Sequence, residues 1–213
     1  MDNPLAIFGA GGHAKVILDA LNCANVRPDF LVEDHRNKSE MFGVPLLSRE
    51  DSRWQSICRF RFVVAVGNNQ NRRRIFQELV HKGGTPINVI HPKATVSPRA
   101  HLGVGVVVFA GAVLNADGSI DDNSIVNTSA SIDHDCRIGA HAHICPGVHL
   151  AGHVTVGTGA LIGIGAAVLP RTVIGDWTVV GAGSVVNRDL PSNVVAFGCP
   201  ARVQREADPD SAA

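Results

Sequence analysis

Valine, leucine and isoleucine return at every sixth residue through the second half of the chain. Counting in steps of six meets one of these three residues sixteen times in succession: Val96, Leu102, Val108, Leu114, Ile120, Val126, Ile132, Ile138, Ile144, Leu150, Val156, Ile162, Val168, Ile174, Val180 and Val186. An α-helix repeats every 3.6 residues or so and a plain strand every two, so neither produces a period of six. The pattern predicts a solenoid of short strands joined by turns.

The residues around these anchors fit a coiling chain. Four positions after an anchor the side chain is usually small, as at Ala112 and Cys136, and one position after it Gly, Asn or Asp is frequent, as at Asp133 and Gly139. Small side chains fit a crowded interior, and Gly, Asn and Asp tolerate the backbone angles of a corner. This pattern resembles the hexapeptide-repeat proteins, whose chains form left-handed parallel β-helices with three hexads per coil. The resemblance implies an all-β left-handed parallel β-helix over residues 91–206.

The first ninety residues follow a different pattern. "LAIFGAGGHAKVILDAL" predicts a buried strand, a glycine turn and a helix, and "DFLVEDHR" predicts a second strand that ends at Asp34. "FRFVVAVGNNQNRRRIFQELVHKG" predicts a third strand, a polar turn and another helix. We therefore expect an α/β domain with a small Rossmann-like parallel sheet over residues 1–90. The end of the chain, residues 207–213, is predicted to be a disordered tail.

The glycine turn carries the first candidate for chemistry. Gly9, Gly11 and Ala14, with Asp34 twenty residues further on, fit the loose dinucleotide fingerprint G-x-G-x-x-A. Ninety residues make half of a doubly wound fold, so one nucleotide fits better than two, and a tight turn without ligand is the alternative. Amide groups at the helix start are available to an anion. Predicted substrate-binding residues are Gly11, Gly12, His13, Lys15, Asp34, Asn68 and Asn69.

Composition and charge exclude several classes of protein. Among 213 residues, 19 Lys and Arg balance 19 Asp and Glu, so no basic face is available for nucleic acid. Signal-peptide features and an apolar run of membrane-spanning length are both missing, so we expect a cytoplasmic protein without membrane insertion. Five cysteines without a C-x-x-C pair argue against a disulfide framework or a cysteine zinc site. The run Arg72, Arg73, Arg74 is predicted to be a solvated helix start, one of whose side chains could meet a phosphate.

Four segments in a fixed order resemble one family. "GAGGHAK", "VIHPKATVSPRA", "IDHDCRIG" and "DLPSNVVAFGCPAR" together resemble the hexapeptide-repeat sugar O- and N-acyltransferases, which modify sialic acid or amino-sugar nucleotides. The resemblance spans Leu5 to Arg202. It implies an amino-terminal domain that binds the nucleotide-activated amino sugar and a β-helix that binds acetyl-CoA. It also implies a homotrimer with active sites between adjacent subunits, and no metal.

The resemblance also implies roles for particular residues. His134 matches the family's catalytic histidine, Asp135 its acidic neighbour, Asn127 an active-site asparagine, and His143 the histidine that faces the acetyl carbonyl. Asp135 departs from the Glu that is frequent in relatives acting on 4-amino sugars, which leaves its orienting role less secure. Implied acetyl-CoA-binding residues are Gly152, Ile164, Gly181 and Ala182.

Repeat arithmetic supports His134 separately. Residues one coil apart differ by eighteen, so His134 is expected between Ala116 and Gly152, whose small size leaves a groove for a thin pantetheine arm. A neutral imidazole can accept the proton that an amine loses as it attacks a thioester. Asp135 would orient that imidazole, and His143 or backbone amides would donate to the oxyanion. Cys136 is expected to point into the core and is rejected as a nucleophile.

Other interpretations remain open at this point. His134 could be a polar side chain on a solvated face, and His141, His149 and His153 are interpreted as scaffold. A zinc-dependent, carbonic-anhydrase-like hydratase would use His143, His149 and His153. A sugar O-acetyltransferase and a non-catalytic nucleotide-binding scaffold are further alternatives. The favoured function is transfer of acetyl from acetyl-CoA to the amine of a UDP-4-amino-4,6-dideoxy sugar, in bacterial surface glycan biosynthesis.

Overall fold

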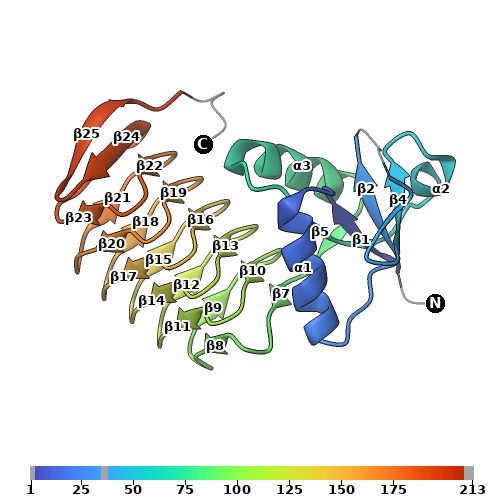
Figure 1. The fold of residues 1–213 in the computed structure, drawn as a ribbon, viewed down its shortest axis with the longest axis horizontal. Helices are drawn as coiled ribbons and strands as arrows, with labels where there is room; N and C mark the ends of the chain where they lie inside the picture. Colours follow the sequence, from blue (N-terminus) through green and yellow to red (C-terminus); the bar gives the residue numbers. More distant parts are fainter. Residues whose placement is uncertain (1–2, 35–37, 209–213) are drawn as a thin grey trace.

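The computed structural model describes residues 3–34 and 38–208; residues 209–213 of the predicted tail lie outside the described residues. An α/β unit stands at one end of a long prism of short strands (Figure 1). The sheet of the α/β unit has the order β3-β4-β2-β1-β5-β6, in which β3 alone is antiparallel. Its strands are β1 (Leu5–Phe8), β2 (Phe30–Glu33), β3 (Glu40–Met41), β4 (Val44–Ser48), β5 (Arg61–Val64) and β6 (Thr85–Pro86).

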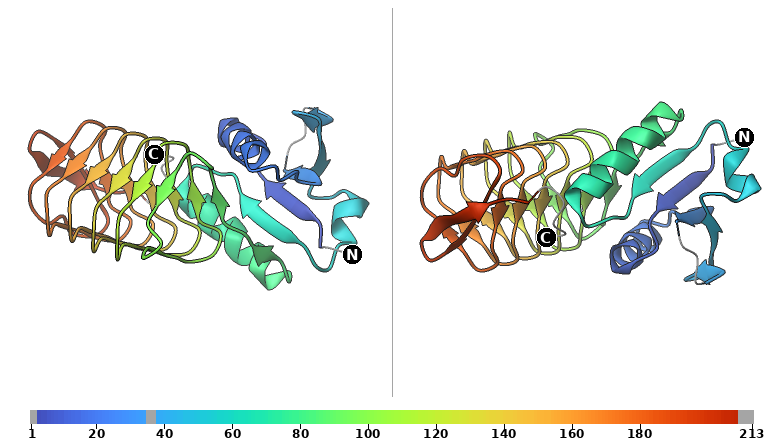
Figure 2. Two further views of the ribbon diagram at one scale, coloured as in Figure 1. Left: turned by 90° about the horizontal axis from the view of Figure 1, so that it is seen from below. Right: turned by 90° about the horizontal axis from the view of Figure 1, so that it is seen from above.

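Helices cover both faces of this sheet. Helix α1 (Gly12–Cys23) packs on the face that carries Ile7, Leu31 and Val63. Helices α2 (Ser52–Gln55) and α3 (Asn69–His81) pack on the face that carries Phe8 and Phe62, and Figure 2 shows α1 and α3 on opposite sides. The three predicted strands and two predicted helices are confirmed. Strands β3, β4 and β6 and helix α2 were not predicted.

The prism has three faces, each a parallel sheet. The first face holds β7 (Val89–Ile90), β10 (Val107–Val108), β13 (Ile125–Val126), β16 (His143–Ile144), β19 (Leu161–Ile162), β22 (Val179–Val180) and the terminal antiparallel hairpin of β24 (Val194–Gly198) and β25 (Ala201–Glu206). The second holds β8 (Thr95–Val96), β11 (Val113–Leu114), β14 (Ser131–Ile132), β17 (His149–Leu150), β20 (Ala167–Val168) and β23 (Val185–Val186). The third holds β9 (His101–Leu102), β12 (Ser119–Ile120), β15 (Arg137–Ile138), β18 (Thr155–Val156) and β21 (Val173–Ile174).

Strands one coil apart pair in a register of eighteen residues, as Ile125 pairs with His143. The second residue of every strand from β8 to β23 is one of the sixteen predicted anchors, and nearly all of them lie in one continuous core. Each fully buried aliphatic side chain contributes about 1.5–3 kcal/mol of transfer free energy. The predicted left-handed β-helix, and with it the fold class, is confirmed.

The prism has three edges, which we name by a residue at each. The Asn127 edge joins the first and second faces, the His134 edge joins the second and third, and the Trp177 edge joins the third and first. Corner residues on these edges adopt positive φ, as Asp135 does at +59° and Trp177 at +55°. These residues lie three positions after an anchor, where Asp117 and Asn123 suit the left-handed region. The Gly, Asn and Asp one position after an anchor do not adopt positive φ, so the corner angles expected for them are wrong. The glycines there allow close approach instead: a Cβ at Gly139 would fall 2.7 Å from the Thr158 amide nitrogen of the next coil.

Arg72 joins the two parts of the molecule, and here the sequence prediction was wrong. Its side chain is 1% exposed, so it does not belong to a solvated helix start. All of its guanidinium donors bond to backbone carbonyls, those of Val66, Gly67, Asn123, His141 and Ala142, at distances of 2.6–3.3 Å. Burial lowers the pKa of Arg72 to about 9. The residue clamps α3 onto the β-helix without any carboxylate among these partners.

None of the helices in the described part of the chain is long and apolar enough to cross a membrane.

Candidate functional site

A hydrogen-bonded pair of neighbouring residues lies on the His134 edge. His134 Nδ1 lies 2.7 Å from Asp135 Oδ2, and both side chains are about half exposed. The hydrogen bond raises the pKa of His134 and lowers the pKa of Asp135. Because Nδ1 is held by the carboxylate, Nε2 is the nitrogen left to accept a proton from a substrate. The corner can therefore supply an oriented general base.

The backbone of the next coil leaves room for the imidazole at this corner. Gly152 lies one coil above His134, as the repeat arithmetic predicted, and a Cβ on Gly152 would fall 2.6 Å from both Cε1 and Nε2 of the imidazole. On the other side, the Asp135 amide donates to the Ala116 carbonyl. Any side chain at position 152 would displace the ring, so the glycine preserves the groove.

His153 also belongs to this corner, although the sequence interpretation treated it as scaffold. Its Nε2 lies 3.6 Å from Asp135 Oδ2, and its ring stands perpendicular to that of His134 with centroids 5.3 Å apart. His153 is also half exposed. The signal that could have located it is the repeat itself, because His153 lies eighteen residues, one coil, after Asp135.

Asn127 and His143 form a second group, on the first face and its Asn127 edge. Asn127 Oδ1 accepts from the Thr128 amide at 2.8 Å, which directs Nδ2 to His143 Nε2 at 3.0 Å. The neutral imidazole then carries its proton on Nδ1, which is buried. The nearby backbone of Gly67 is not placed for a full hydrogen bond to Nδ1, although it still favours the protonated ring. His13 lies beside it, with ring centroids 6.1 Å apart.

Burial keeps both histidines of this second group neutral. Burial, followed by the charge of the nearby Arg72, lowers the pKa of His13 to about 4 and that of His143 to about 3. Neither ring can serve as a proton acceptor at neutral pH, because its conjugate acid would be too strong. A neutral N–H donor is the role that this environment leaves to His143.

The two groups do not meet within one chain. His134 and Gly152 stand on one edge of the prism, whereas Asn127 and the predicted acetyl-CoA residues Ile164, Gly181 and Ala182 stand on the next. Ile164 is 60% exposed on that edge, and a side chain at Gly165 beside it would meet open space. The predicted catalytic residues thus lie on two surfaces of one subunit.

The predicted acceptor residues surround the start of α1. Gly11 precedes the helix and, having no side chain, gives no side-chain cap to the first N–H groups. Gly11, Gly12 and Lys15 are exposed, and His13 borders the second group. Free N–H groups at a helix start bind phosphate well.

Glu33 is the acidic residue at this turn, and sequence reasoning did not select it. Its carboxylate accepts from the Ala10 amide at 2.6 Å. Asp34, the predicted ribose partner, instead pairs with Arg49 at 2.8 Å. Strand β2 ends at Glu33, one residue earlier than predicted, which explains the difference.

Asn68 and Asn69 have structural partners. The Asn68 side chain caps α3 by accepting from the Asn71 amide at 2.9 Å. The Asn69 Nδ2 donates to the carbonyls of Gly159 and Ala160 at 3.0 and 3.1 Å. Both residues border a cavity beside α3.

The three histidines of the zinc hypothesis are dispersed within one chain. His143 lies beneath the α/β unit, His149 bonds to Ser131 Oγ at 2.8 Å, and His153 lies beside Asp135. Among the described residues, two other groups bring potential ligand atoms within 4.8 Å of one another: His134, Asp135 and His153, and separately Asp19, Cys23 and His91.

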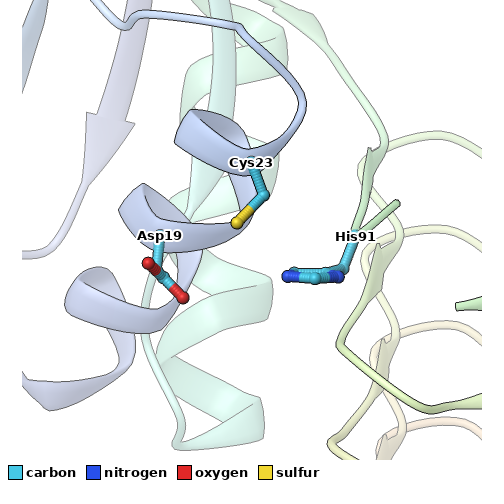
Figure 3. Close-up of side chains that lie close together, drawn as sticks. All are labelled: Asp19, Cys23 and His91. Carbon is cyan, nitrogen blue, oxygen red and sulfur yellow. The ribbon is translucent and has the colours of Figure 1, made fainter. Parts of the chain in front are cut away.

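Figure 3 shows the second of these groups, in which Asp19 and Cys23 of α1 face His91. His91 Nδ1 accepts from the Lys93 amide at 3.0 Å. That bond places the proton of the neutral ring on Nε2, the nitrogen that points towards the thiol and the carboxylate. A protonated Nε2 can neither bind a metal ion nor deprotonate a thiol, so the group is not a preformed metal or nucleophile site.

Comparison with known proteins finds relatives of both parts of the molecule. Residues 4–79 match the family described as PglD N-terminal domain, and residues 153–188 match bacterial transferase hexapeptide (six repeats). The crystal structure of PerB from Caulobacter crescentus, in complex with CoA and GDP-perosamine, is 41% identical with a TM-score of 0.87. The match covers 96% of this chain and 98% of that one. The chain belongs to the hexapeptide-repeat sugar acyltransferases.

Two further relatives are similar over nearly their whole length. The acetyltransferase domain of PglB from Neisseria gonorrhoeae, in complex with acetyl coenzyme A, is 36% identical with a TM-score of 0.85, over 96% of this chain and all of that one. The GDP-perosamine N-acetyltransferase of Escherichia coli O157:H7 is 26% identical over 96% of this chain and 98% of its own length.

Proposed function

We propose that the protein transfers an acetyl group from acetyl-CoA to the amine of a nucleotide-linked amino sugar, with His134 as general base. The observation that carries this proposal is the His134–Asp135 hydrogen bond at 2.7 Å, which orients a half-exposed imidazole that packs against Gly152 and leaves Nε2 to accept a proton. Nε2 takes the proton as the amine attacks the thioester carbonyl, and CoA leaves as the thiol. The reaction passes through a tetrahedral oxyanion and needs no acyl-enzyme.

The two cysteines of the β-helix that lie nearest to His134 and His143 in the sequence support direct transfer. Cys136 is fully buried in the core, as the repeat pattern predicted, and burial raises the pKa of its thiol. Cys145 is buried too, with the pKa of its thiol raised by burial to about 11. A thiol that remains protonated is a poor nucleophile.

The working unit is proposed to be a cytoplasmic homotrimer with the active site between subunits. Within one chain, His134 and the acceptor side of the molecule lie on different edges of the prism, so a second copy is needed to bring them together. We assign residues 1–90 to the acceptor and residues 91–206 to acetyl-CoA. Gly152 and His134 of one subunit would then face Ile164, Gly181 and Ala182 of the next across the acetyl-CoA groove.

The acceptor nucleotide is proposed to bind at the start of α1. The amides of the exposed residues Gly11 and Gly12 suit a diphosphate. The Nδ1–H of His143 suits an oxygen atom of the acceptor substrate, close to His13. GDP-perosamine is the first acceptor to test, because two relatives matched over nearly the whole chain have names or bound ligands containing it. The uridine nucleotide expected from the sequence remains a prediction.

The test measures release of the CoA thiol from acetyl-CoA with GDP-perosamine and, separately, with a UDP-4-amino-4,6-dideoxy sugar. We expect turnover with one of them and a loss of about 10²–10⁴-fold in His134→Ala, the usual contribution of a general base. Unchanged turnover in His134→Ala would refute the base. A product acetylated on oxygen would refute N-transfer, and turnover that depends on added zinc would revive a metal mechanism.

A further inference from the structure

A cavity of about 390 Å³ lies between α3 and the first face of the β-helix, towards the Trp177 edge. Both groups described above lie elsewhere, on the other two edges and beneath α1. Among the described residues that border the cavity, only Asp208, at its rim, is acidic. The cavity therefore belongs neither to the proposed base nor to the proposed acceptor turn.

One face of α3 lines the cavity with polar groups. Gln70, Arg73, Arg74 and Gln77 follow the helical spacing i, i+3, i+4, i+7 and so point the same way. A helix face that packed directly on the β-helix would be apolar at these positions. The opposite face of α3 is apolar in this way at Ile75 and Leu79, where it packs on the sheet of the α/β unit. Two guanidinium and two carboxamide groups instead line a partly open cavity.

The opposite wall has a different character. Leu161 and Val179, from β19 and β22, give it an aliphatic surface. The Trp177 ring lies beside them with one side against Gly159, where no side chain would fit. The Arg73 guanidinium lies over the ring, 5.5 Å from its centroid. A flat ligand can thus rest on an apolar wall while it faces cations and amides.

The side chain of Asn69 separately indicates that a ligand belongs in the cavity. It is 7% exposed and borders the cavity, and two carbonyl bonds fix its Nδ2. Its Oδ1 is buried without a hydrogen-bond partner among the described residues. A buried acceptor of this kind is costly unless a donor is supplied.

We propose that this cavity binds an adenine nucleotide, with the purine on the Leu161–Val179 wall and the phosphate on Arg73 and Arg74. Guanidinium groups bind phosphate in a bidentate manner, and the start of α3 adds the positive end of its dipole. Carboxamides present the paired donor and acceptor that the adenine edge requires, and Gln70 and Gln77 supply them. The volume lies within the usual range for ligand sites.

The chain holds two tryptophans, Trp54 in the core of the α/β unit and Trp177 in the cavity, so fluorescence can report on the site directly. AMP is titrated into Trp54→Phe, in which Trp177 is the remaining fluorophore. We expect a saturable change, with the dissociation constant raised about tenfold in Arg73→Gln and unchanged in Arg59→Gln. If Trp54→Phe does not fold, the difference between the natural chain and Trp177→Phe gives the same signal.

Titrations with two further ligands show which part of the nucleotide the cavity binds. Ribose 5-phosphate is expected to bind at least about tenfold more weakly than AMP, because it lacks the base. Equal affinity would overturn the proposal, as would the absence of a saturable change with AMP or a change insensitive to Arg73→Gln. CoA carries an adenosine phosphate as well; if CoA but not AMP gave the Arg73-dependent change, the cavity would belong to the donor site and a separate nucleotide site would be refuted.

Discussion

The imidazole of His134 lies directly against the α-carbon of Gly152, so closely that a Cβ at position 152 would fall 2.6 Å from Nε2. The contact joins two consecutive coils of the β-helix, because the two residues are eighteen positions apart. The regular repeat of the β-helix therefore determines what surrounds the proposed base. The six-residue repeat places a glycine where the ring packs, and the exposed part of the half-exposed ring is where a thioester can approach.

Gly152→Ala is expected to lower kcat for acetyl transfer by about 10–100-fold while the protein stays folded, because the methyl group displaces the His134 ring from its position. Gly118→Ala is the matched control, since a Cβ there would meet its nearest atom at 3.4 Å, an ordinary contact. Steady-state kinetics and circular dichroism of both variants check this. Full activity in Gly152→Ala would show that the ring position is irrelevant to turnover.

Asp135→Asn is expected to shift the acid limb of the pH–rate profile to lower pH and to reduce the plateau about tenfold or more. The Asp135 hydrogen bond raises the pKa of His134, and the base works only when neutral, so activity rises with pH through that pKa. Removing the carboxylate lowers the pKa and leaves the tautomer unfixed. A limb that stays in place or moves to higher pH would contradict the pairing of the two residues. Asp133→Asn, which alters the neighbouring carboxylate, gives a control for general loss of charge.

Features of the fold and the site could be predicted from the sequence where their signal is local, and were missed where it is not. The β-helix could be predicted because each coil repeats the same short pattern, and His134 against Gly152 followed from counting. Glu33 could not be selected over Asp34, because strand ends are uncertain by a residue or two and the choice between the two carboxylates depends on that residue.

Arg72 shows the other limit. Its burial follows from the helical spacing that continues Ile75, Phe76 and Leu79 backwards through Arg72 to Asn69, a buried face visible in the sequence once α3 is placed. A run of three arginines suggested solvent instead. The helical spacing selects Arg72 from the three, but the carbonyls of Asn123, His141 and Ala142 that accept from its guanidinium belong to a distant segment, and no local pattern records them.

Arg72→Met is expected to reduce the free energy of unfolding by about 3 kcal/mol or more, because five backbone carbonyls lose their buried donors. Arg74→Gln is the matched control on the same helix, and its side chain is 63% exposed, so a change within ~0.5 kcal/mol is expected. Urea denaturation at one protein concentration compares them. Equal stability of the two variants would refute the clamp between α3 and the β-helix.

Stability is also expected to fall as the pH drops from about 6.5 towards 4, and His141 is one identifiable cause. His141 is 8% exposed, and burial, followed by the nearby Arg72 and Arg73, lowers its pKa to about 4. Between these two values the unfolded chain binds a proton that the folded chain does not, so acid favours unfolding; above pH 6.5 the effect is absent.

His141→Asn isolates this contribution. Asparagine tolerates the φ of +62° at this corner, and its Oδ1 can replace Nδ1 as the acceptor from Asn123. We expect the loss of unfolding free energy between pH 7 and pH 5, measured by urea denaturation, to be smaller in the variant by roughly 1–2 kcal/mol. His13 and His143, whose pKa values are lowered in the same direction, keep the remaining dependence in both proteins. Identical losses would show that His141 binds its proton as readily in the folded chain as in the unfolded one.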